Sequence, residues 1–416
     1  MRGALAADGR LLAPACWTVA SGRTVSLERG AAAGVPACDA LLLPSLVNAH
    51  SHLDLAGAPA IPSRGRFTDW LLAVGGVRGD ARDVEAEAGR EAGGLLRRGV
   101  TAVGDIDASA GRATAGRRRA GLEGPSYLEI VGVRAESARA RLAESLALLD
   151  RLGGGGVFGL SPHAPYSVHG EVLAEIARAA QRRGLRLAMH LAETPEETRY
   201  LLSGDGPFEG FLGTIGRGRP FEAPPRLRPV AYADRAGLLR AGCVVVHGND
   251  LDDDDVALLA ERRASVVYCH GTHRHFERAR HRLVELCAAG VNVALGTDSG
   301  LSNAAVDLLA EARRLLADRA DVDPLLLLRC ATVNGRVALR LDPAPSLFAA
   351  GAAADALLLA EPPPNVEAAP PRDVAAWAFS DAARPVLTLR AGEPVATDGA
   401  LPAAIVAFLD TVRRHG

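Results

Sequence analysis

The 416-residue chain contains no lysine, so all 47 of its basic residues are arginines. Without a lysine amine there can be no Schiff base to pyridoxal phosphate or to a carbonyl substrate. A lysine carbamate that bridges two metal ions is excluded for the same reason. The absence of one residue type therefore removes a whole set of mechanisms before any motif is considered.

Three further absences limit the setting of the protein. The six cysteines include no CxxC spacing, which indicates reduced thiols in the cytoplasm rather than a disulfide framework. No apolar run near residue 1 is long enough for a signal peptide, and no stretch of about 18 apolar residues predicts a membrane span. The net charge is only −2, without a basic stripe interleaved with aromatics. We therefore expect a cytoplasmic protein with no membrane and no nucleic-acid partner.

The chain is long enough and apolar enough to bury a large core, because 48% of its 416 residues are hydrophobic. Candidate strands alternate with amphipathic helices. The candidate strands cover residues 41–50, 100–107, 126–133, 157–163, 185–192, 243–249, 264–271 and 291–298. The candidate helices include residues 83–98, 136–151, 168–183, 252–262 and 303–318. Eight strands with intervening helices predict an α/β fold, a (β/α)8 TIM barrel.

The two ends of the chain differ from this middle part. They contain short apolar pieces broken by Gly and Pro, which are typical of β-strands. We expect residues 1–40 and 341–416 to form one small, composite β-sandwich domain beside a barrel over residues 41–340. A Pro- and Gly-rich segment, 204–229, interrupts the fifth repeat, and loops of this length often act as lids or binding loops.

Ligand-type side chains stand where four of the candidate strands end. They are His50 and His52 in NAHSHLD, His190 in MHLAE, His247 in VVVHGND and Asp298 in VNVALGTDSG. Barrel active sites are built at the C-terminal strand ends, so we expect these side chains to converge. The HxH pair puts both imidazoles on one face, because strand side chains alternate. Imidazoles with one carboxylate suit Zn²⁺ with an open position for water, although iron or manganese would also fit.

A hydrolytic site of this kind also needs a base and an acid, because a metal lowers the pKa of its water toward about 7 but does not move the protons. Asp298, within reach of both metal and water, is the candidate base. Glu193, three residues after His190, is the candidate proton shuttle to a ring nitrogen or carbonyl of the substrate. His247 either binds the metal or hydrogen-bonds the attacking water.

The motifs resemble, in order, those of the amidohydrolase superfamily over roughly residues 41–340. The resemblance is to the branch that holds guanine, adenosylhomocysteine/methylthioadenosine and aminodeoxyfutalosine deaminases and triazine chlorohydrolases. It also implies the TIM barrel and a flanking β-sandwich. The matching pieces are PSLVNAHSHLD, SPHAPYSV, HLAETPEE, VVHGNDL, VVYCHGTH, GVNVALGTDSGLSN and ATVNGRVAL.

The resemblance assigns roles to particular residues. His247 would lie beside the water, Glu193 would be the acid/base, and His163 of SPHAPYS would bind substrate. The missing lysine agrees with a branch that uses a single metal ion. That ion would be held by His50, His52, His190 and Asp298.

One motif departs from the pattern of this branch. Where relatives often read Cys-Pro-x-Ser-Asn after the seventh strand, this chain has CHGTH over residues 269–273, followed by His275. A histidine thus replaces the usual Asn contact, and comparable versions occur among aminodeoxyfutalosine deaminases. His273 either contacts the substrate, directly or through the residues around it, or lies on a solvated loop. The role of His270 is left open.

Two more residues are weaker pocket candidates. Trp70, in RGRFTDWLL, either stacks on a heterocycle or simply packs its helix. Arg134 follows the third strand and either meets a carboxylate or ribose oxygen of the substrate or is a surface charge.

The leading interpretation is a metal-dependent hydrolytic deaminase of an amino-substituted purine nucleoside or related heterocycle, with an aminodeoxyfutalosine-type substrate favoured. The alternative within enzymes is hydrolysis of a cyclic amide or of a halogenated ring, as in imidazolonepropionase or the chlorohydrolases. The alternative outside enzymes is a catalytically inactive barrel that serves as a binding or scaffold protein. Inactive relatives of this kind usually lose metal ligands, whereas all of the expected ligands are present in this sequence. We expect a small-molecule substrate. A homodimer is also expected, because members of this branch commonly form one.

Overall fold

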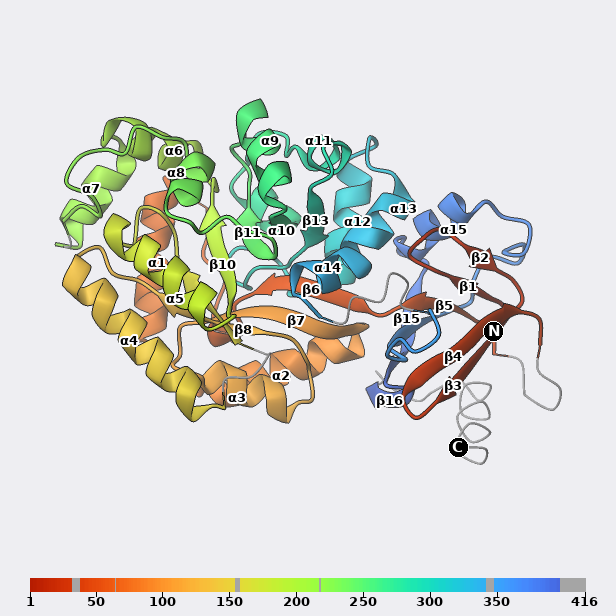
Figure 1. The fold of residues 1–416 in the computed structure, drawn as a ribbon. Helices are drawn as coiled ribbons and strands as arrows, with labels where there is room; N and C mark the ends of the chain where they lie inside the picture. Colours follow the sequence, from red (N-terminus) through yellow and green to blue (C-terminus); the bar gives the residue numbers. More distant parts are fainter. Residues whose placement is uncertain (32–37, 64, 154–157, 217, 342–347, 397–416) are drawn as a thin grey trace.

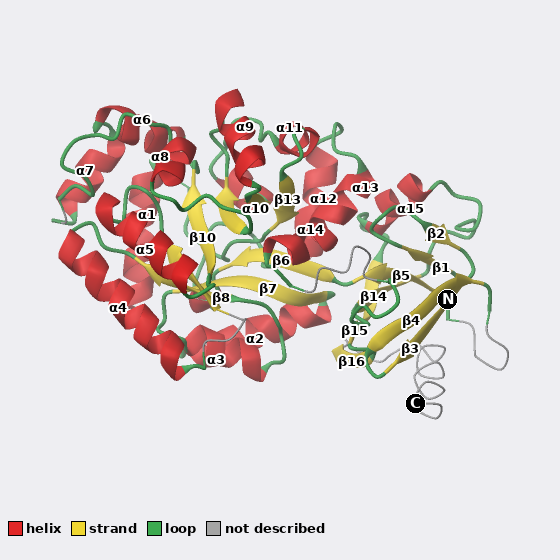
Figure 2. Ribbon diagram, viewed as in Figure 1, coloured by secondary structure: helices red, strands yellow, loops and turns green. Residues whose placement is uncertain are grey.

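The computed structural model describes residues 1–31, 38–63, 65–153, 158–216, 218–341 and 348–396. Within these residues, eight parallel strands form one sheet in which neighbours in the chain are neighbours in space. Figures 1 and 2 show these strands at the centre of the larger part of the molecule, with helices around them. The strands are β6 (Leu46–Ser51), β7 (Val100–Asp107), β8 (Ser126–Ile130), β9 (Phe158–Pro162), β10 (Arg186–Leu191), β11 (Cys243–His247), β12 (Ser265–Tyr268) and β13 (Asn292–Leu295).

The sheet closes into a barrel between its first and last strands. The backbone N–H groups of Thr297 and Asp298, just after β13, donate to the carbonyl of His50 in β6 at 3.0 and 3.2 Å. Asn48 strengthens the same seam, since its amide donates to Thr297 Oγ1 and its Oδ1 accepts from the Thr297 N–H. The predicted TIM barrel is thus confirmed, and two of the residues that close it are the ligand-type His50 and Asp298.

Alternation along the strands separates the barrel interior from its outer layer. In β11, Val244 and Val246 lie in a cluster inside the barrel, whereas Cys243 and Val245 pack with the surrounding helices. By this alternation His247 would point outward. The backbone of His247 instead has a φ of +73°, which departs from strand geometry. The alternation is thereby broken at His247, whose side chain joins the cluster.

Helices cover the outer face of the barrel. Those predicted over 83–98, 136–151, 168–183 and 252–262 are confirmed to within two residues at each end as α2, α4, α5 and α9. The helix predicted over 303–318 starts only at Leu308, because the Asp307 side chain caps it by accepting from two backbone N–H groups. The helices are α1 (Phe67–Gly79), α2 (Val84–Arg97), α3 (Arg112–Arg119), α4 (Ala135–Arg151), α5 (Gly170–Arg182), α6 (Pro195–Ser203), α7 (Pro207–Thr214), α8 (Pro229–Arg235), α9 (Asp253–Arg262), α10 (His270–His275), α11 (Leu283–Ala288), α12 (Leu308–Asp318), α13 (Pro324–Ala331), α14 (Val333–Ala338) and α15 (Pro371–Ala378), with a 3₁₀ turn η1 (Leu53–Leu55).

A second, mixed sheet combines strands from both ends of the chain, as expected, with β5 and β14 paired antiparallel. Figure 1 shows these N-terminal and C-terminal strands side by side at one end of the molecule. A separate hairpin of β3 and β4 packs on it. The strands are β1 (Gly3–Leu5), β2 (Leu11–Leu12), β3 (Ala15–Ala20), β4 (Arg23–Arg29), β5 (Ala40–Pro44), β14 (Ala356–Ala360), β15 (Arg384–Arg390) and β16 (Glu393–Ala396).

One strand prediction needs correction: residues 41–50 are two strands rather than one. The first, β5, belongs to the terminal sheet, and only β6 belongs to the barrel. β5 reads as part of a continuous apolar run because both of its faces are buried: Leu42 packs in the core beside the hairpin, while Leu41 and Leu43 pack in the barrel-side core. The domain division at residues 40/41 and 340/341 stays a prediction; residues 342–347 and 397–416 lie outside the described part.

The segment 204–229 is partly helical rather than a continuous loop. It contains α7, whose first residue, Pro207, suits a helix start because proline lacks the N–H that would go unpaired there. Among the described residues, no helix combines the length and the apolar character that crossing a membrane requires.

Candidate active site

Five ligand-type side chains from four strand ends meet at one mouth of the barrel. Their ligand atoms form two overlapping groups, each with all atoms within 4.8 Å of one another. One group holds His50, His52 and His190, and the other holds His50, His247 and Asp298. All five are buried. The convergence expected from the sequence is therefore present in the folded chain.

The spacing within this cluster fits a shared cation. The Nε2 atoms of His52 and His190 lie 3.1 Å apart. Two nitrogens on one tetrahedral zinc, with bonds of about 2.0–2.1 Å, would lie roughly 3.3 Å apart. His50 Nε2 is buried without a hydrogen-bond partner among the described residues, and it faces Asp298 Oδ1 at 3.5 Å. A bound cation would satisfy the buried His50 nitrogen, which has no hydrogen-bond partner among the described residues.

The two oxygens of Asp298 have different surroundings. Oδ1 faces His50 and His52, at 3.5 and 3.8 Å, whereas Oδ2 accepts hydrogen bonds from the hydroxyls of Thr272 at 3.0 Å and Ser302 at 3.2 Å. Burial opposes ionisation of Asp298, but the close approach of the imidazole groups, His50 first and then His52 and His247, outweighs burial and lowers the pKa of the carboxyl. Asp298 is therefore an ionised carboxylate with one oxygen turned to the cluster.

Burial favours the neutral form of His50, His190 and His247. His52 differs, because Asp54 and Asp298 outweigh its burial and raise its pKa. His190 donates from Nδ1 to the carbonyl of His163 at 3.0 Å, which leaves the electron pair on Nε2 directed at the cluster. Burial lowers the pKa of His247 to about 3, and it lowers the pKa of His190 as well, with His163 and the cluster histidines adding to the effect. Neutral imidazoles are the form that binds a metal.

Glu193 lies beside this cluster, with its Oε1 at 3.6 Å from His247 Nε2. Its backbone is fixed on both sides: the N–H donates to Glu197, and the carbonyl accepts from the Asn249 amide. Burial, with Asp298 nearby, raises the pKa of Glu193 well above its usual value. A raised pKa favours the protonated form of the carboxyl group, which is the form that acts as a general acid.

A pocket of about 50 Å³ opens onto the cluster, and two of the predicted substrate-binding residues line it. His163 has its pKa lowered to about 4 by burial, and its Nδ1 is hydrogen-bonded to Ser167 Oγ at 2.7 Å. Trp70 contributes its ring, and its Nε1 is buried without a hydrogen-bond partner among the described residues. The lining is His52, Leu55, Phe67, Trp70, Leu71, Val74, Arg78, His163, Tyr166, His190, Glu193, His247, Asp298 and Ser299.

The other two predicted substrate-binding residues lie elsewhere. Arg134 is the N-cap residue of α4; its side chain is exposed, bonds to the carbonyl of Gly216, and lines a separate surface pocket. Arg134 stands four residues beyond the end of β8, at the start of α4. His273 is buried outside the pocket lining and donates to Asn249 Oδ1 at 3.2 Å, so it is not on a solvated loop.

The histidines of the motif after the seventh strand do not line the pocket; His273 contacts a residue that holds the site residue Glu193 in place. His273 reaches Glu193 through Asn249, whose amide bonds the Glu193 carbonyl. His270 bridges the Tyr268 hydroxyl and the Asp318 carboxylate at 2.8 Å each. His281, which the sequence did not single out, donates from Nε2 to the His247 carbonyl at 3.0 Å.

Sequence reasoning also missed Glu129 and Arg78. Glu129 lies on β8, and its Oε2 forms an ion pair with Arg78 Nη1 at 2.5 Å, with the Glu129 side chain only 1% exposed. Burial would raise the pKa of Glu129, but Arg78, His163 and His52 lower it to about 2. A single acid inside the apolar stretch SYLEI was the signal available in the sequence.

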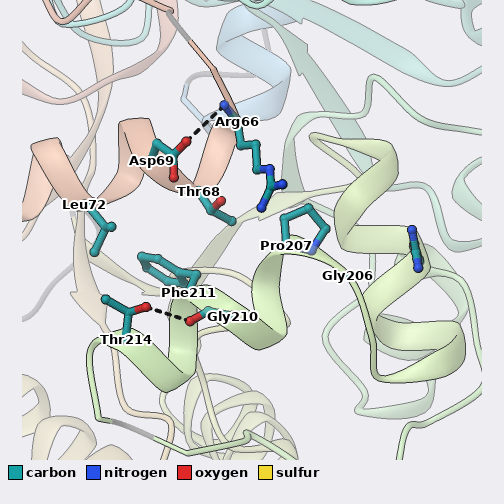
Figure 3. Close-up of a pocket in the computed structure, with 10 residues that line it drawn as sticks. Arg66, Thr68, Asp69, Leu72, Gly206, Pro207, Gly210, Phe211 and Thr214 are labelled. Atoms are coloured by element: carbon teal, nitrogen blue, oxygen red, sulfur yellow. Dashed lines mark hydrogen bonds between the residues drawn. The ribbon is translucent and has the colours of Figure 1, made fainter.

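A second pocket, of about 490 Å³, lies between α1 and α7 (Figure 3). Polar groups in its wall pair locally: the Arg66 N–H donates to Asp69, and the Thr214 hydroxyl donates to the Gly210 carbonyl. Its lining is Arg66, Thr68, Asp69, Leu72, Arg199, Gly206, Pro207, Gly210, Phe211 and Thr214. Because it lacks the converging ionisable groups, we place the chemistry in the smaller pocket.

Comparison with known proteins agrees with this geometry. The amidohydrolase family model matches residues 41–395. The aminodeoxyfutalosine deaminase of Deinococcus radiodurans is 32% identical over 315 residues, covering 71% of this chain and 73% of the relative. The 5-methylthioadenosine/S-adenosylhomocysteine deaminase of Haloarcula marismortui is 29% identical over 322 residues, covering 74% and 70%. The crystal structure of an adenosine deaminase from Xanthomonas campestris with bound zinc has a TM-score of 0.75 at 23% identity, covering 100% and 97%, which shows the shared fold.

Proposed function

Since this chain belongs to the amidohydrolase family, we propose that it is a metal-dependent hydrolytic deaminase of an amino-substituted purine nucleoside or related heterocycle. An aminodeoxyfutalosine-type substrate is favoured, because the relative from Deinococcus radiodurans carries that activity in its name. The observation that carries the proposal is the convergence of four buried histidines, a buried aspartate and a buried glutamate at one mouth of the barrel.

We propose that His50, His52, His190 and Asp298 hold one divalent cation. Zinc suits this set of imidazoles and one carboxylate best, and Fe²⁺ is the second choice. His247 either completes the ligand set or hydrogen-bonds the attacking water. When bound, such a cation lowers the pKa of a water molecule and so supplies hydroxide near neutral pH.

The side chains supply the proton transfers. Asp298, ionised and turned to the cluster through Oδ1, accepts a proton from the attacking water. Glu193, whose protonated form is favoured by burial, donates to a ring nitrogen as water adds to the carbon that bears the amino group. His163 holds the heterocycle as a neutral hydrogen-bonding partner, and Trp70 provides an aromatic wall. Asp298 then passes the proton it took from water to the departing amino group, and Glu193 takes back a proton from the new hydroxyl, so the C–N bond breaks, ammonia leaves and the ring carbonyl forms.

The experiment that tests this proposal is an ammonia-release screen. It covers adenosine derivatives, including aminodeoxyfutalosine, together with guanine, cytosine, amino- and chlorotriazines and cyclic amides. Ammonia from a purine derivative, with kcat/KM well above that of the other compounds, supports the proposal. Chloride release from a triazine, or opening of a cyclic amide without ammonia release from any purine, contradicts it.

Glu193→Gln should retain the metal but abolish turnover, because the amide keeps the shape of the side chain yet has no acidic proton to give. General acid–base groups contribute about 10²- to 10⁴-fold, so we expect kcat to fall at least 100-fold. Metal content by plasma mass spectrometry should stay near one equivalent. The matched control is the exposed Glu222→Gln, which should leave both readouts unchanged. Full activity of Glu193→Gln would show that this residue is not the proton shuttle.

The remaining expectations stay predictions. They are a cytoplasmic location, the lack of a nucleic-acid or membrane partner, and a homodimer.

A further inference from the structure

The turn that carries Glu193 has an unusual backbone. It joins β10 to α6, and its first residue, Ala192, has a φ of +51°. Residues with a β-carbon rarely adopt this left-handed conformation, so the turn needs contacts that hold it. The turn also has a demanding task. His190 faces the cluster from the end of β10, and Glu193, three residues later, must reach the same cluster.

Glu197 supplies the contacts on the N–H side of this turn. Its Oε1 accepts from the Ala192 N–H at 3.2 Å, and its Oε2 accepts from the Glu193 N–H at 2.9 Å. Glu197 is the third residue of α6, a position from which a glutamate commonly accepts from the N–H of the N-cap residue. Here the buried carboxyl group reaches further back, past the N-cap residue Thr194, to the turn itself.

The turn after β11 supplies the contacts on the carbonyl side. The N–H groups of Asn249 and Asp250 donate to the Ala192 carbonyl at 2.8 and 2.9 Å. The side-chain amide of Asn249 donates to the Glu193 carbonyl at 3.1 Å. α6 holds this second turn as well, because the Thr198 hydroxyl donates to Asp250 Oδ2 at 2.5 Å. All four backbone polar atoms of Ala192 and Glu193 are therefore bonded within the protein.

The carboxyl group of Glu193 is left facing the pocket. Its Oε1 lies 3.6 Å from His247 Nε2, which is longer than a hydrogen bond, and Glu193 lines the pocket at the cluster. An acid that gives and regains a proton must keep its carboxyl oxygens open to the reacting molecule. Its position then has to be set through its backbone, which is where the bonds of Glu197 and Asn249 lie.

We propose that Glu197 and Asn249 are positioning residues for Glu193. By bonding the N–H and carbonyl groups of its turn, they keep Ala192 in the left-handed conformation and hold the Glu193 carboxyl group at the reacting heterocycle. Both residues lie outside the pocket lining and act only through Glu193. This inference rests on the proposed function, because it takes Glu193 as the proton shuttle.

The first test is the effect of Glu197→Gln on turnover of the best substrate from the ammonia-release screen. Glutamine keeps the shape of the side chain, but its amide nitrogen cannot accept, so one N–H group of the turn loses its partner. A misplaced catalytic group costs up to about 100-fold in rate, so kcat should fall roughly 10- to 100-fold while KM changes less than about threefold. Metal content should stay near one equivalent. An unchanged kcat overturns the role of Glu197.

A double variant separates positioning from a general loss of structure. If Glu197 acts through Glu193, Glu197→Gln should change the residual kcat of Glu193→Gln by less than about threefold, because the shuttle it positions is already lost. Multiplication of the two separate losses contradicts the inference. Should Glu197→Gln fail to fold, Asn249→Ala takes its place in the same cycle, since it removes the bond to the Glu193 carbonyl and leaves Glu197 intact.

The matched control is Asp107→Asn. Asp107 is also a buried carboxylate that accepts from two backbone N–H groups in a turn after a barrel strand, those of Ser109 and Thr114 after β7. Asp107→Asn should therefore lower stability as Glu197→Gln does, but it should leave kcat unchanged. An equal fall of kcat in both variants would show that any loosened turn at the barrel mouth has this effect, which overturns the specific role of Glu197.

Failure of the proposed function would be recognised separately, because protection of backbone amides does not require turnover. Hydrogen exchange is followed by mass spectrometry in the peptide that contains Ala192 and Glu193. Glu197→Gln should speed exchange there roughly 10-fold, whereas Asp107→Asn should speed it only in the peptide that contains Ser109 and Thr114. This pattern in a wild type that releases no ammonia supports the hold on the turn and contradicts the deaminase proposal. Unchanged exchange in Glu197→Gln overturns the hold on the turn, whatever the activity.

Discussion

At the scale of single residues, the site depends on side chains that never touch the expected cation. Asp298 can present Oδ1 to the cluster because the hydroxyls of Thr272 and Ser302 occupy Oδ2. These hydroxyls also lie 3.0 Å from each other, so the carboxylate plane is fixed from two sides. Outer groups of this kind orient a ligand and tune its basicity.

Thr272→Val should therefore weaken metal binding while keeping the shape of the side chain. We expect about a 10- to 100-fold loss of zinc affinity, measured by competition with a fluorescent chelator. Thr272→Ser restores the hydroxyl and should recover most of the affinity. Thr332→Val, which also removes a buried hydroxyl but at a helix near the opposite end of the barrel, should leave zinc affinity unchanged. Equal affinities of Thr272→Val and Thr272→Ser would refute the role of the hydroxyl.

At the scale of elements, the contact between β6 and the end of β13 both closes the barrel and sets the site. Asn48 exchanges two hydrogen bonds with Thr297 across this seam, at 2.8 and 3.1 Å. His50 follows Asn48 by two positions, and Asp298 follows Thr297 by one. A shift of one strand past the other would move both ligand-type side chains at once.

Asn48→Ala should destabilise the fold and loosen the metal site together. Loss of the two buried hydrogen bonds predicts a decrease of about 1–3 kcal/mol in the free energy of unfolding, measured with urea. Zinc affinity should fall as well. Asn292→Ala removes two amide hydrogen bonds at the other end of β13, so it should lower stability similarly without changing zinc affinity. If both variants bind zinc like the wild type, the seam does not position the site.

At the scale of the whole molecule, burial of histidines makes stability depend on pH. His273 is 7% exposed, and burial, with His270, Arg278 and Arg319 nearby, lowers its pKa to about 4. In the unfolded chain a histidine takes up its proton near pH 6.5. Between these values the unfolded state binds more protons, so the folded state loses stability as the pH falls from about 6.5 toward 4.

The metal-free protein should accordingly lose about 2 kcal/mol of unfolding free energy on account of His273 alone between pH 7 and pH 5. His273→Gln lacks this titrating group. Between pH 7 and pH 5 its free energy of unfolding should therefore decrease by about 2 kcal/mol less than that of the wild type. Urea unfolding at the two pH values measures the difference. Parallel pH profiles for wild type and His273→Gln would contradict the lowered pKa.

The barrel could be predicted from the sequence because its evidence is local. Each strand is a short apolar run, and each helix repeats its apolar positions within a few residues. The helix ends are equally local, as Asp307 shows by capping α12. The division of residues 41–50 into two strands was missed because β5 is buried on both faces, so its leucines continue the apolar run without a break.

The sequence by itself determined which residues could form the cluster, since strand ends of a parallel barrel must share one mouth and the motifs stand at those ends. Only the tertiary structure decided which other side chains reach them. Asn48 and Thr297 are 249 positions apart, and Glu129 and Arg78 are 51 apart. Such pairs form only when the barrel closes and α1 folds over its mouth. No local pattern records them, because hydrogen bonds and ion pairs depend on distance in space, whereas periodicity reports only on neighbours in the chain.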